Sequence, residues 1–191
     1  MERLFANPAI SRARAAADAY RDGRGDFAVL TGGWSVEHRR LRRRLAGDSA
    51  WDEFAGICES LPILGGLGQV DDNFLDLPGG ASRAVTLRRF DPSIGRWSIW
   101  WGDGRTGRLD PPVQGRFEAG VGTFSGVDTL EGRTLQVRYI WSEMSPASAR
   151  WEQAFSADRG AHWETNWIMQ FRPAAAGRWA TAKMGKEETE L

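Results

Sequence analysis

The sequence predicts an all-β fold, an antiparallel up-and-down barrel of about ten strands, with one α-helix at its N-terminus. Between residues 26 and 172, short runs of alternating apolar and polar residues are separated by turn-forming residues at intervals of about 8–14 residues. The composition combines 23 Gly with 10 Trp, as expected for short strands joined by tight turns around a wide interior. This rhythm is typical of a barrel or a sandwich, and no second helical pattern interrupts it.

Length and charge exclude several classes of protein. The chain has 191 residues, enough for one domain with a substantial core, and 25 basic residues balance 25 acidic ones. No global charge therefore favours nucleic acid or an anionic membrane. Cys58 is the single cysteine, so no internal disulfide forms, and no apolar run approaches the length that spans a bilayer. We expect a soluble protein of the cytoplasm with neither a membrane nor a nucleic-acid partner.

Residues 1–25 are predicted to form the N-terminal helical segment. Asn7 suits the cap position, Pro8 the first helical position and Gly23 the end of the helix. An apolar stripe at spacings of three and four runs along one face, at Ile10, Ala13, Ala17 and Tyr20. This face is expected either to cover one end of its own domain or to contact a second subunit.

The first strand begins after a glycine-rich link. Trp34, Val36 and His38 alternate as in a strand, and the switch of apolar parity at Leu41 predicts a β-bulge, although a helix face is also compatible. Five arginines follow within six positions, at Arg39, Arg40, Arg42, Arg43 and Arg44. Because no aromatic residues are interleaved and the chain is neutral, a solvated strand face or a charge network is favoured over nucleic-acid binding.

The remaining strands are predicted from alternation between turn signals. The second strand is expected at Trp51–Ser60, followed by a turn or irregular crossing at residues 61–68, and residues 103–107 form another turn. The later strands are predicted at Gln69–Leu77, Arg83–Phe90, Arg96–Gly102, Val113–Ala119, Gly122–Leu130, Thr134–Trp141, Trp151–Ser156 and Trp163–Phe171. Residues 173–191 lose this periodicity and are interpreted as an extension, a short element around Trp179 and a tail.

Tryptophan positions on the Arg96–Gly102 strand predict an outward-facing aromatic residue. Trp97 and Trp101 share one face of this strand, and Trp100 lies on the other. An exposed tryptophan in such a strand is often part of an interface. Together with the N-terminal helix, it makes the sequence compatible with a homodimer.

For the final hairpin, Arg150–Arg172, the alternation leaves two choices for the face that points into the barrel. Trp151 and Phe155 share a face with Gln153, so Gln153 points inward if the aromatic face does. With the opposite parity Glu152, Glu164 and Asn166 line the interior, where carboxylates would be candidates for general acid–base chemistry. The aromatic residues favour the first arrangement.

Two features resemble known families. Gly32-Gly33-Trp34 at the first strand and Arg172 at the last resemble the calycin, or lipocalin-like, kernel. That resemblance implies a closed barrel over residues 26–172, in which Trp34 packs at the closed end beneath Arg172. Together with TLRRFDPSIGRWSIWW, QGRFEAGVGTF and the final hairpin, the chain resembles a bacterial family of calycin-like barrels without an established activity. The resemblance therefore implies the fold rather than a function.

The loop of the final hairpin contains a second motif. Ser156, Asp158, Gly160 and Trp163 are similar to the S-x-D-x-G-x-x-W box of sialidase propeller blades. A propeller needs this box or its blade repeated, and no second copy occurs. We therefore expect Asp158 and Gly160 to stabilise the turn, and no sialidase activity follows.

Few residues are suited to metal binding or nucleophilic catalysis. His38 and His162 are the only histidines, and no HxH or CxxC spacing occurs, so no metal site is expected. Nitrobindin-like barrels bind haem through a late-strand histidine, but His162 falls in a hairpin loop. His38 is either a polar pocket residue or a core histidine with its hydrogen bonds satisfied. Cys58 has no adjacent histidine, and no nucleophile motif is present.

The favoured hypothesis is that a Trp-lined barrel cavity binds a small, mainly hydrophobic or aromatic molecule. Either Arg88 or its neighbour Arg89 would meet an anionic group of the ligand. The alternatives are a lipocalin-like enzyme that uses a buried His or Glu, and a dimeric interaction module whose barrel is filled by its own side chains. No particular cofactor is indicated. The predicted lining comprises His38, Arg88, Trp101, Tyr139, Trp141, Trp151, Gln153 and Trp167.

Overall fold

The computed structural model describes residues 23–175. The predicted N-terminal helix and the element around Trp179 therefore lie outside the described residues. Within the described range one antiparallel sheet of 11 strands is closed on itself, because β4 also pairs with β5. The strands are β1 (Gly32–Leu41), β2 (Trp51–Ile63), β3 (Gly68–Leu75), β4 (Ser82–Asp91), β5 (Arg96–Asp103), β6 (Arg108–Leu109), β7 (Val113–Glu118), β8 (Val121–Leu130), β9 (Arg133–Ser145), β10 (Ser148–Ser156) and β11 (Glu164–Pro173).

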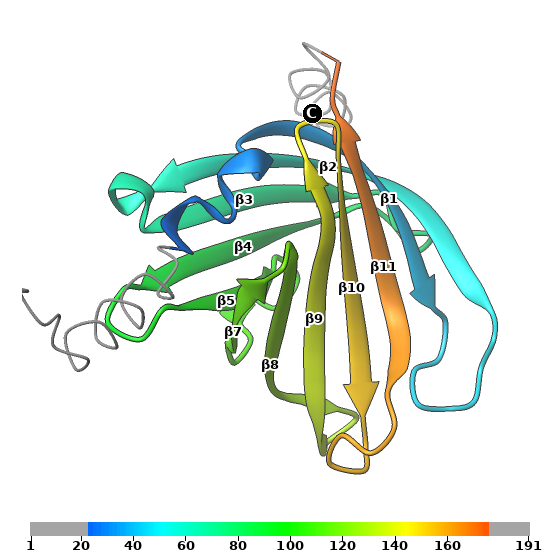
Figure 1. Ribbon diagram of the computed structural model, residues 1–191. Helices are drawn as coiled ribbons and strands as arrows, with labels where there is room; N and C mark the ends of the chain where they lie inside the picture. Colours follow the sequence, from blue (N-terminus) through cyan, green and yellow to red (C-terminus); the bar gives the residue numbers. More distant parts are fainter. Residues whose placement is uncertain (1–22, 176–191) are drawn as a thin grey trace, which may run out of the picture.

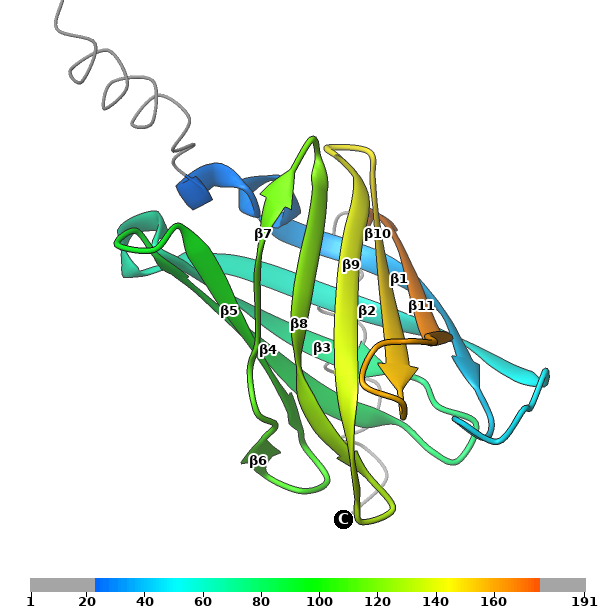
Figure 2. The same cartoon turned by 60° about the horizontal axis from the view of Figure 1, so that its bottom comes forward.

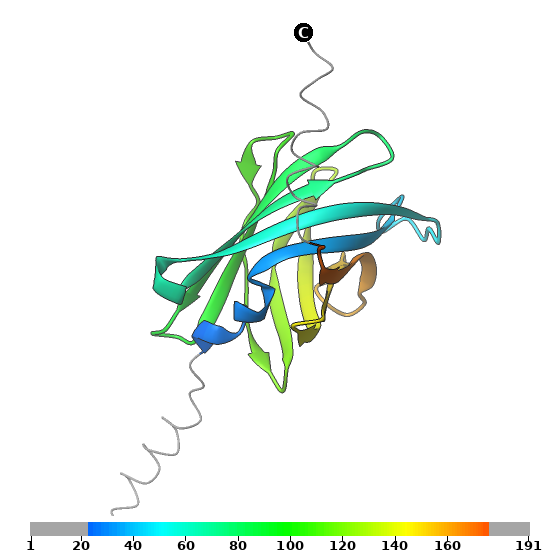
Figure 3. The same cartoon turned by 90° about the horizontal axis from the view of Figure 1, so that it is seen from above.

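The connectivity is up-and-down (Figure 1). Each strand of the ring pairs with its neighbours in the chain, and β1 pairs with β11. The short β6 pairs with β5 outside this ring, which leaves a closed 10-strand barrel as predicted. Seen from above, strands β1–β4 cross over strands β8–β11, so the barrel is strongly twisted (Figure 3).

Several strand boundaries differ from the prediction. β9 runs on to Ser145 and β10 begins at Ser148, so both strands are longer than predicted. β2 runs on to Ile63 rather than ending at Ser60, because Leu61, Pro62 and Ile63 continue the pairing with β3. The turn between them is confined to Leu64–Gly66 (η3), where all three residues have positive φ. The strand β6 also lies just beyond the turn predicted at residues 103–107.

The expected bulge in β1 is wrong. The register between β1 and β2 continues without a shift from Gly32 opposite Ser60 to Leu41 opposite Trp51. Arg40 therefore keeps the inward parity of Trp34, Val36 and His38. The apolar residue at position 41 misled the prediction, since the inward position is occupied by an arginine.

One end of the barrel is closed by residues 23–30, named here the plug segment. It contains two 3₁₀ turns, η1 (Gly23–Gly25) and η2 (Ala28–Leu30), and lies at the end where the β7–β8 and β9–β10 hairpins turn (Figure 2). Three side chains of the barrel donate hydrogen bonds to its backbone carbonyl oxygens: Trp34 Nε1 to Leu30 (2.7 Å), Gln69 Nε2 to Phe27 (3.0 Å) and Trp97 Nε1 to Gly23 (3.1 Å).

Phe27 is the apolar centre of this closed end. Its ring, 1% exposed, makes edge-on contacts with Trp97 at 5.0 Å, Phe117 at 5.1 Å and Trp141 at 5.7 Å between centroids. Aromatic pairs in this arrangement are stabilising beyond the area that they bury. The closed half of the barrel is therefore filled by its own side chains.

The predicted contact between Arg172 and Trp34 is wrong. Trp34 is 3% exposed and pairs with Pro173, whereas Arg172 is exposed and pairs with Ser35. Adjacent residues of a strand face opposite sides of the sheet, so the two side chains lie on opposite faces. Trp34 instead packs edge-on against Phe171, with 6.4 Å between ring centroids.

The loop between β10 and β11 is held by its own side chains. Asp158 Oδ1 accepts hydrogen bonds from Ser156 Oγ at 2.8 Å and from His162 N at 2.9 Å, and Gly160 N donates to Ser156 Oγ at 2.8 Å. Gly160 has a φ of 91°. These bonds hold the pKa of Asp158 well below its usual value, the largest cause being the His162 amide. Trp163 Nε1 donates to Gly160 O at 3.0 Å and closes the turn.

Candidate functional site

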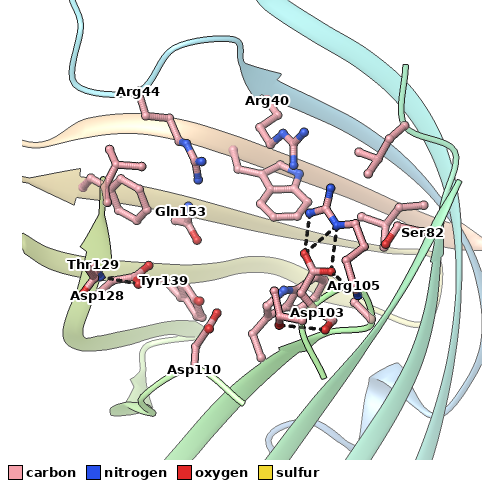
Figure 4. Close-up of a pocket in the computed structure, with 18 of the residues that line it drawn as sticks. Arg40, Arg44, Ser82, Asp103, Arg105, Asp110, Asp128, Thr129, Tyr139 and Gln153 are labelled. Carbon is pink, nitrogen blue, oxygen red and sulfur yellow. Dashed lines mark hydrogen bonds and ion pairs between the residues drawn. The ribbon is translucent and has the colours of Figure 1, made fainter. Parts of the chain in front are cut away.

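A cavity of about 380 Å³ lies at the barrel end opposite the plug segment. Its lining comes from β5, β9, β10 and β11 and from the ends of β1, β3, β4 and β8, with the loops that follow them (Figure 4). The end that holds the plug segment is packed, and this end is hollow. The candidate site is therefore the open half of the barrel interior.

Three tryptophans and a tyrosine form an aromatic wall on the inner side of the cavity. The ring centroid of Trp167 lies 5.7 Å from that of Trp101 and 5.7 Å from that of Trp151, both in edge-on geometry. Tyr139 packs edge-on against Trp151 at 4.9 Å. All four residues line the cavity, so they present an apolar surface to whatever occupies it.

Alternation along each strand explains the inward position of these rings. Trp101 shares its face with the buried Trp97 and Ile99, and pairs with Thr86 of β4. Trp100 lies on the outer face between them. Trp151 is opposite Trp141 on β9 and opposite Met169 on β11, all of them buried.

His38 lies behind the aromatic wall and does not line the cavity. Trp167 Nε1 donates a hydrogen bond to His38 Nδ1 at 3.2 Å, and the His38 ring stacks on Phe54 with 4.6 Å between centroids. Nε2 faces the backbone of Gly56, where a Cβ atom would collide with it. Burial lowers the pKa of His38 to about 3, and the nearby Arg40 guanidinium adds to this. The imidazole is therefore neutral and positions Trp167.

Gln153 faces the cavity together with Trp151 and Phe155. The register between β10 and β11 shifts at Gln153/Ala154, so Asn166 becomes the extra residue of a β-bulge. Its side chain turns inward and is 0% exposed, and Asn166 Oδ1 accepts a hydrogen bond from Gln153 Nε2 at 2.8 Å. Simple alternation had placed Gln153 and Asn166 on opposite faces, and the bulge brings them together.

The two glutamates of this hairpin do not line the cavity. Glu152 is half-buried and forms an ion pair of 2.8 Å with Arg150. Glu164 Oε1 accepts a hydrogen bond from Leu45 N at 2.7 Å. The carboxylates that the opposite parity would have turned inward therefore have partners outside the cavity.

Arginines form one rim of the cavity mouth. Arg40, at the end of β1, and Arg44, in the β1–β2 loop, both line the cavity and enter it from the same side (Figure 4). The Arg40 guanidinium lies 5.3 Å from the centroid of the Trp167 ring, and that of Arg44 lies 5.7 Å from Phe155. Burial lowers the pKa of Arg40, and repulsion by Arg44 and Arg105 lowers it further.

Carboxylates lie across the mouth from these arginines (Figure 4). Asp103 is engaged by Arg105, whose Nε donates to its Oδ1 at 2.9 Å. Asp110 and Asp128 also line the cavity. Partial burial raises the pKa of Asp110, and the negative charges of Asp128 and Asp103 raise it further. The pKa of Tyr139 is raised by burial first and then by Asp128 and Asp110, so the phenol stays protonated.

Arg88 lies deeper, below the aromatic wall. It is 1% exposed and forms a two-point ion pair with Asp71, with Nη1–Oδ1 and Nη2–Oδ2 distances of 2.7 and 2.6 Å. Nη1 also donates to Gln69 Oε1 at 3.1 Å. The guanidinium lies 4.7 Å from the Phe27 ring and 5.1 Å from the Trp141 ring. Arg88 is thus the inward member of the Arg88–Arg89 pair, and its charge is already matched by Asp71.

A small void of about 20 Å³ lies between Arg88 and the aromatic wall. Trp141 borders it, as do Trp101, Tyr139 and Trp151 of the larger cavity. Arg88 Nε and Trp141 Nε1 are buried and have no hydrogen-bond partner among the described residues. A void of this volume has room for about one water molecule. The polar floor of the barrel is therefore separated from the mouth by the aromatic wall.

The structure brings five of the eight predicted lining residues to one cavity. These are Trp101, Tyr139, Trp151, Gln153 and Trp167. Arg88 and Trp141 border the deeper void, and His38 supports Trp167 from behind. The charged rim of Arg40, Arg44, Asp103, Asp110 and Asp128 was not predicted. Arg40 and Asp128 carried a usable signal, because each continues the inward alternation of its strand, β1 and β8. Asp103 continues the alternation of Trp97, Ile99 and Trp101 one residue beyond the predicted strand.

Among residues 23–175, no group of three or more His, Cys, Asp or Glu side chains is arranged to hold a metal ion. Cys58 is buried at 2% exposure, and burial raises its pKa, so its thiol stays protonated. In the same part of the chain, no helix has both the length and the apolar character needed to cross a membrane.

Comparison with known proteins bears on the fold. No protein-family model and no curated protein matches the sequence. The S-type phycobiliprotein lyase CPES from Guillardia theta has a similar structure, with a TM-score of 0.55 at 6% sequence identity, covering 84% of this chain and 97% of that one. The chain has a lipocalin-like fold. At this identity the likeness extends to the fold alone, and the resemblance to a bacterial family stays a prediction.

Proposed function

We propose that this lipocalin-like barrel binds a small, mainly hydrophobic or aromatic molecule in its open half. The observation that carries the proposal is the cavity of about 380 Å³ walled by Trp101, Trp151 and Trp167. Binding pockets for small molecules are typically about 300–1,000 Å³ and mostly apolar with a few fixed polar groups. This cavity is at the small end of that volume range, which suits a ligand of two or three fused or linked rings. Its aromatic wall is apolar, whereas its mouth carries charged side chains, so its exposed lining as a whole is more polar than apolar.

The aromatic wall supplies the surface that such a ligand needs. Trp167 is held by the hydrogen bond to His38 behind the wall and by edge-on packing against Trp151 within it. A wall that is ordered before binding loses little conformational entropy when the ligand enters. Gln153, held by Asn166, adds a fixed polar group to this wall.

The two other hypotheses have less support. A catalytic His38 is disfavoured, since it is neutral and does not reach the cavity. A barrel filled throughout by its own side chains is disfavoured by the cavity itself. The similar structure is a phycobiliprotein lyase, and a pigment-like molecule falls within the proposed ligand class. A homodimer and a cytoplasmic location stay predictions.

Tryptophan fluorescence tests the proposal directly. N-phenylnaphthylamine, an uncharged two-part aromatic probe, should quench the intrinsic fluorescence saturably. Trp101→Ala should weaken its binding roughly ten-fold, because stacking and burial of one large ring are lost. Trp100→Ala is the matched control, since this neighbour lies on the outer face and its loss should leave the affinity unchanged. The absence of saturable binding, or equal effects of the two substitutions, would refute the proposal.

A further inference from the structure

We propose that the ligand carries an anionic group at one end and that Arg40 and Arg44 bind this group at the cavity mouth. The inference rests on the proposed function and narrows the ligand to an aromatic anion. It concerns a different part of the cavity from the aromatic wall. The two can therefore be tested separately.

The first observation is that neither guanidinium group has a carboxylate within ion-pair distance among residues 23–175, although Asp52 and Asp103 act on Arg40 from farther away and raise its pKa in part. Neither Arg40 nor Arg44 forms an ion pair with any residue in the described range. Each is placed by aromatic faces instead, Arg40 against Phe54 at 5.6 Å and Trp167 at 5.3 Å, and Arg44 against Phe155 at 5.7 Å. A guanidinium stacked on a ring keeps its edge N–H groups available for a carboxylate, sulfonate or phosphate.

The rest of the arginine run provides the comparison. Arg39 pairs with Glu53 at 3.1 Å, Arg42 with Asp52 at 2.8 Å and Arg43 with Asp48 at 3.1 Å. These ion pairs are on the outside of the barrel, where solvent would have screened an unpaired charge at little cost. Within this run, the two arginines without an ion pair among the described residues are the two that line the cavity, where an unpaired charge is more costly. A ligand anion would supply the missing partner.

The position of the arginines relative to the aromatic wall defines the shape of the ligand. Arg40 rests on Trp167, a member of the wall, and Arg44 rests on Phe155, which lines the same cavity. A ring system lying against the wall thus has one end beside both guanidinium groups. Two cations on the same rim can contact one anionic group from two directions.

The carboxylates on the opposite rim of the mouth disfavour a second anionic group on the ligand. Asp110 and Asp128 face the cavity from the other side, and the pKa of Asp110 is raised by burial first and then by the negative charges of Asp128 and Asp103. An anionic group near this rim would be repelled, while one near Arg40 and Arg44 would be attracted. The mouth therefore favours a ligand charged at the arginine end alone and fixes the direction in which it enters.

Two probes with the same ring system test the inference. Anilinonaphthalene sulfonate differs from N-phenylnaphthylamine by its sulfonate group, and both report binding by fluorescence. The wild-type protein should bind the sulfonate about ten-fold more tightly, as expected for one or two charge-assisted hydrogen bonds. Arg40→Gln and Arg44→Gln should each reduce this preference, and the double variant should abolish it while binding of the uncharged probe stays within about two-fold.

Arg39→Gln is the matched control, because it removes the neighbouring charge from the outer face. It should keep the wild-type preference. Equal affinity of the two probes for the wild-type protein, or a preference that survives in the folded double variant, would overturn the inference and leave the proposed function standing. If the uncharged probe does not bind at all, the proposed function fails first, and the inference fails with it. Circular dichroism of each variant establishes that it is folded.

Discussion

The neutral, buried His38 predicts a specific loss of stability in mild acid. In the folded protein the pKa of His38 is lowered to about 3, because the ring is buried behind Trp167 and lies near Arg40. In the unfolded chain a histidine titrates near about 6.5. As the pH falls below this value, the unfolded chain takes up a proton and the folded protein does not. The free energy of unfolding should therefore fall between about pH 6.5 and pH 3.

The size of the effect follows from these two pKa values. At about pH 5 nearly all unfolded molecules carry the extra proton, and at about pH 7 only a minority do. Integrating the difference gives a loss of about 2 kcal/mol between the two conditions. The loss depends only weakly on the native pKa, provided that it stays well below 5. It is large enough to shift a urea unfolding midpoint by roughly 1 M.

The variant that isolates the effect is His38→Asn. The amide oxygen of asparagine can occupy roughly the position of Nδ1 and still accept the hydrogen bond from Trp167, but it does not titrate. The free energy of unfolding is measured by urea unfolding followed by circular dichroism at about pH 7 and at about pH 5. Its decrease from the higher to the lower pH should be smaller in this variant than in wild type by about 2 kcal/mol. A fall of the same size in His38→Asn would refute a buried, neutral His38.

Two further predictions concern the closed half of the barrel. Arg88→Met should lower the free energy of unfolding by roughly 3–5 kcal/mol, because it leaves the Asp71 carboxylate buried without its partner. Adding Asp71→Asn should recover part of this loss. If the losses of the two single variants simply add in the double variant, the pairing is contradicted. Phe27→Ala removes the ring at the centre of the plug segment and should cost roughly 3–5 kcal/mol in denaturant unfolding, whereas a loss below about 1 kcal/mol would mean that the plug is not part of the core.

Alternation was sufficient to predict most of the barrel from the sequence. Every predicted strand overlaps a strand of the structure, because each has one face against the interior and one toward solvent. The same reasoning placed Trp101, Trp151 and Trp167 on one side of the sheet, where they form the aromatic wall. Turn residues were similarly informative: the loop at Asp158 and Gly160 has the internal hydrogen bonds that the motif implies.

The charged part of the site could not be predicted in the same way. Polar residues on an inward face look like an interruption of the strand, and this is how Arg40 was misread when a bulge was assigned to β1. A real bulge lies in β11, where one extra residue turns Asn166 inward, and no local pattern marks it. Asp110 and Arg44 lie beyond strand ends, so alternation says nothing about where their side chains point. Only the closure of the barrel brings them together.

The buried arginine in the closed half of the barrel, Arg88, differs from the two at its open end, Arg40 and Arg44, in whether the fold supplies a carboxylate partner. Arg88 has a buried carboxylate partner 2.6 Å away and aromatic rings at its side, so its charge is matched by the fold. Arg40 and Arg44 have the rings without a carboxylate at ion-pair distance among the described residues, and the charge of Arg44 adds to the burial that lowers the pKa of Arg40. The neighbouring arginines Arg39, Arg42 and Arg43 each form an ion pair with an acidic residue, whereas these two do not. Within the run Arg39–Arg44, the two arginines without an ion pair among the described residues are the two at the hollow end of the barrel, where a ligand would supply the missing partner.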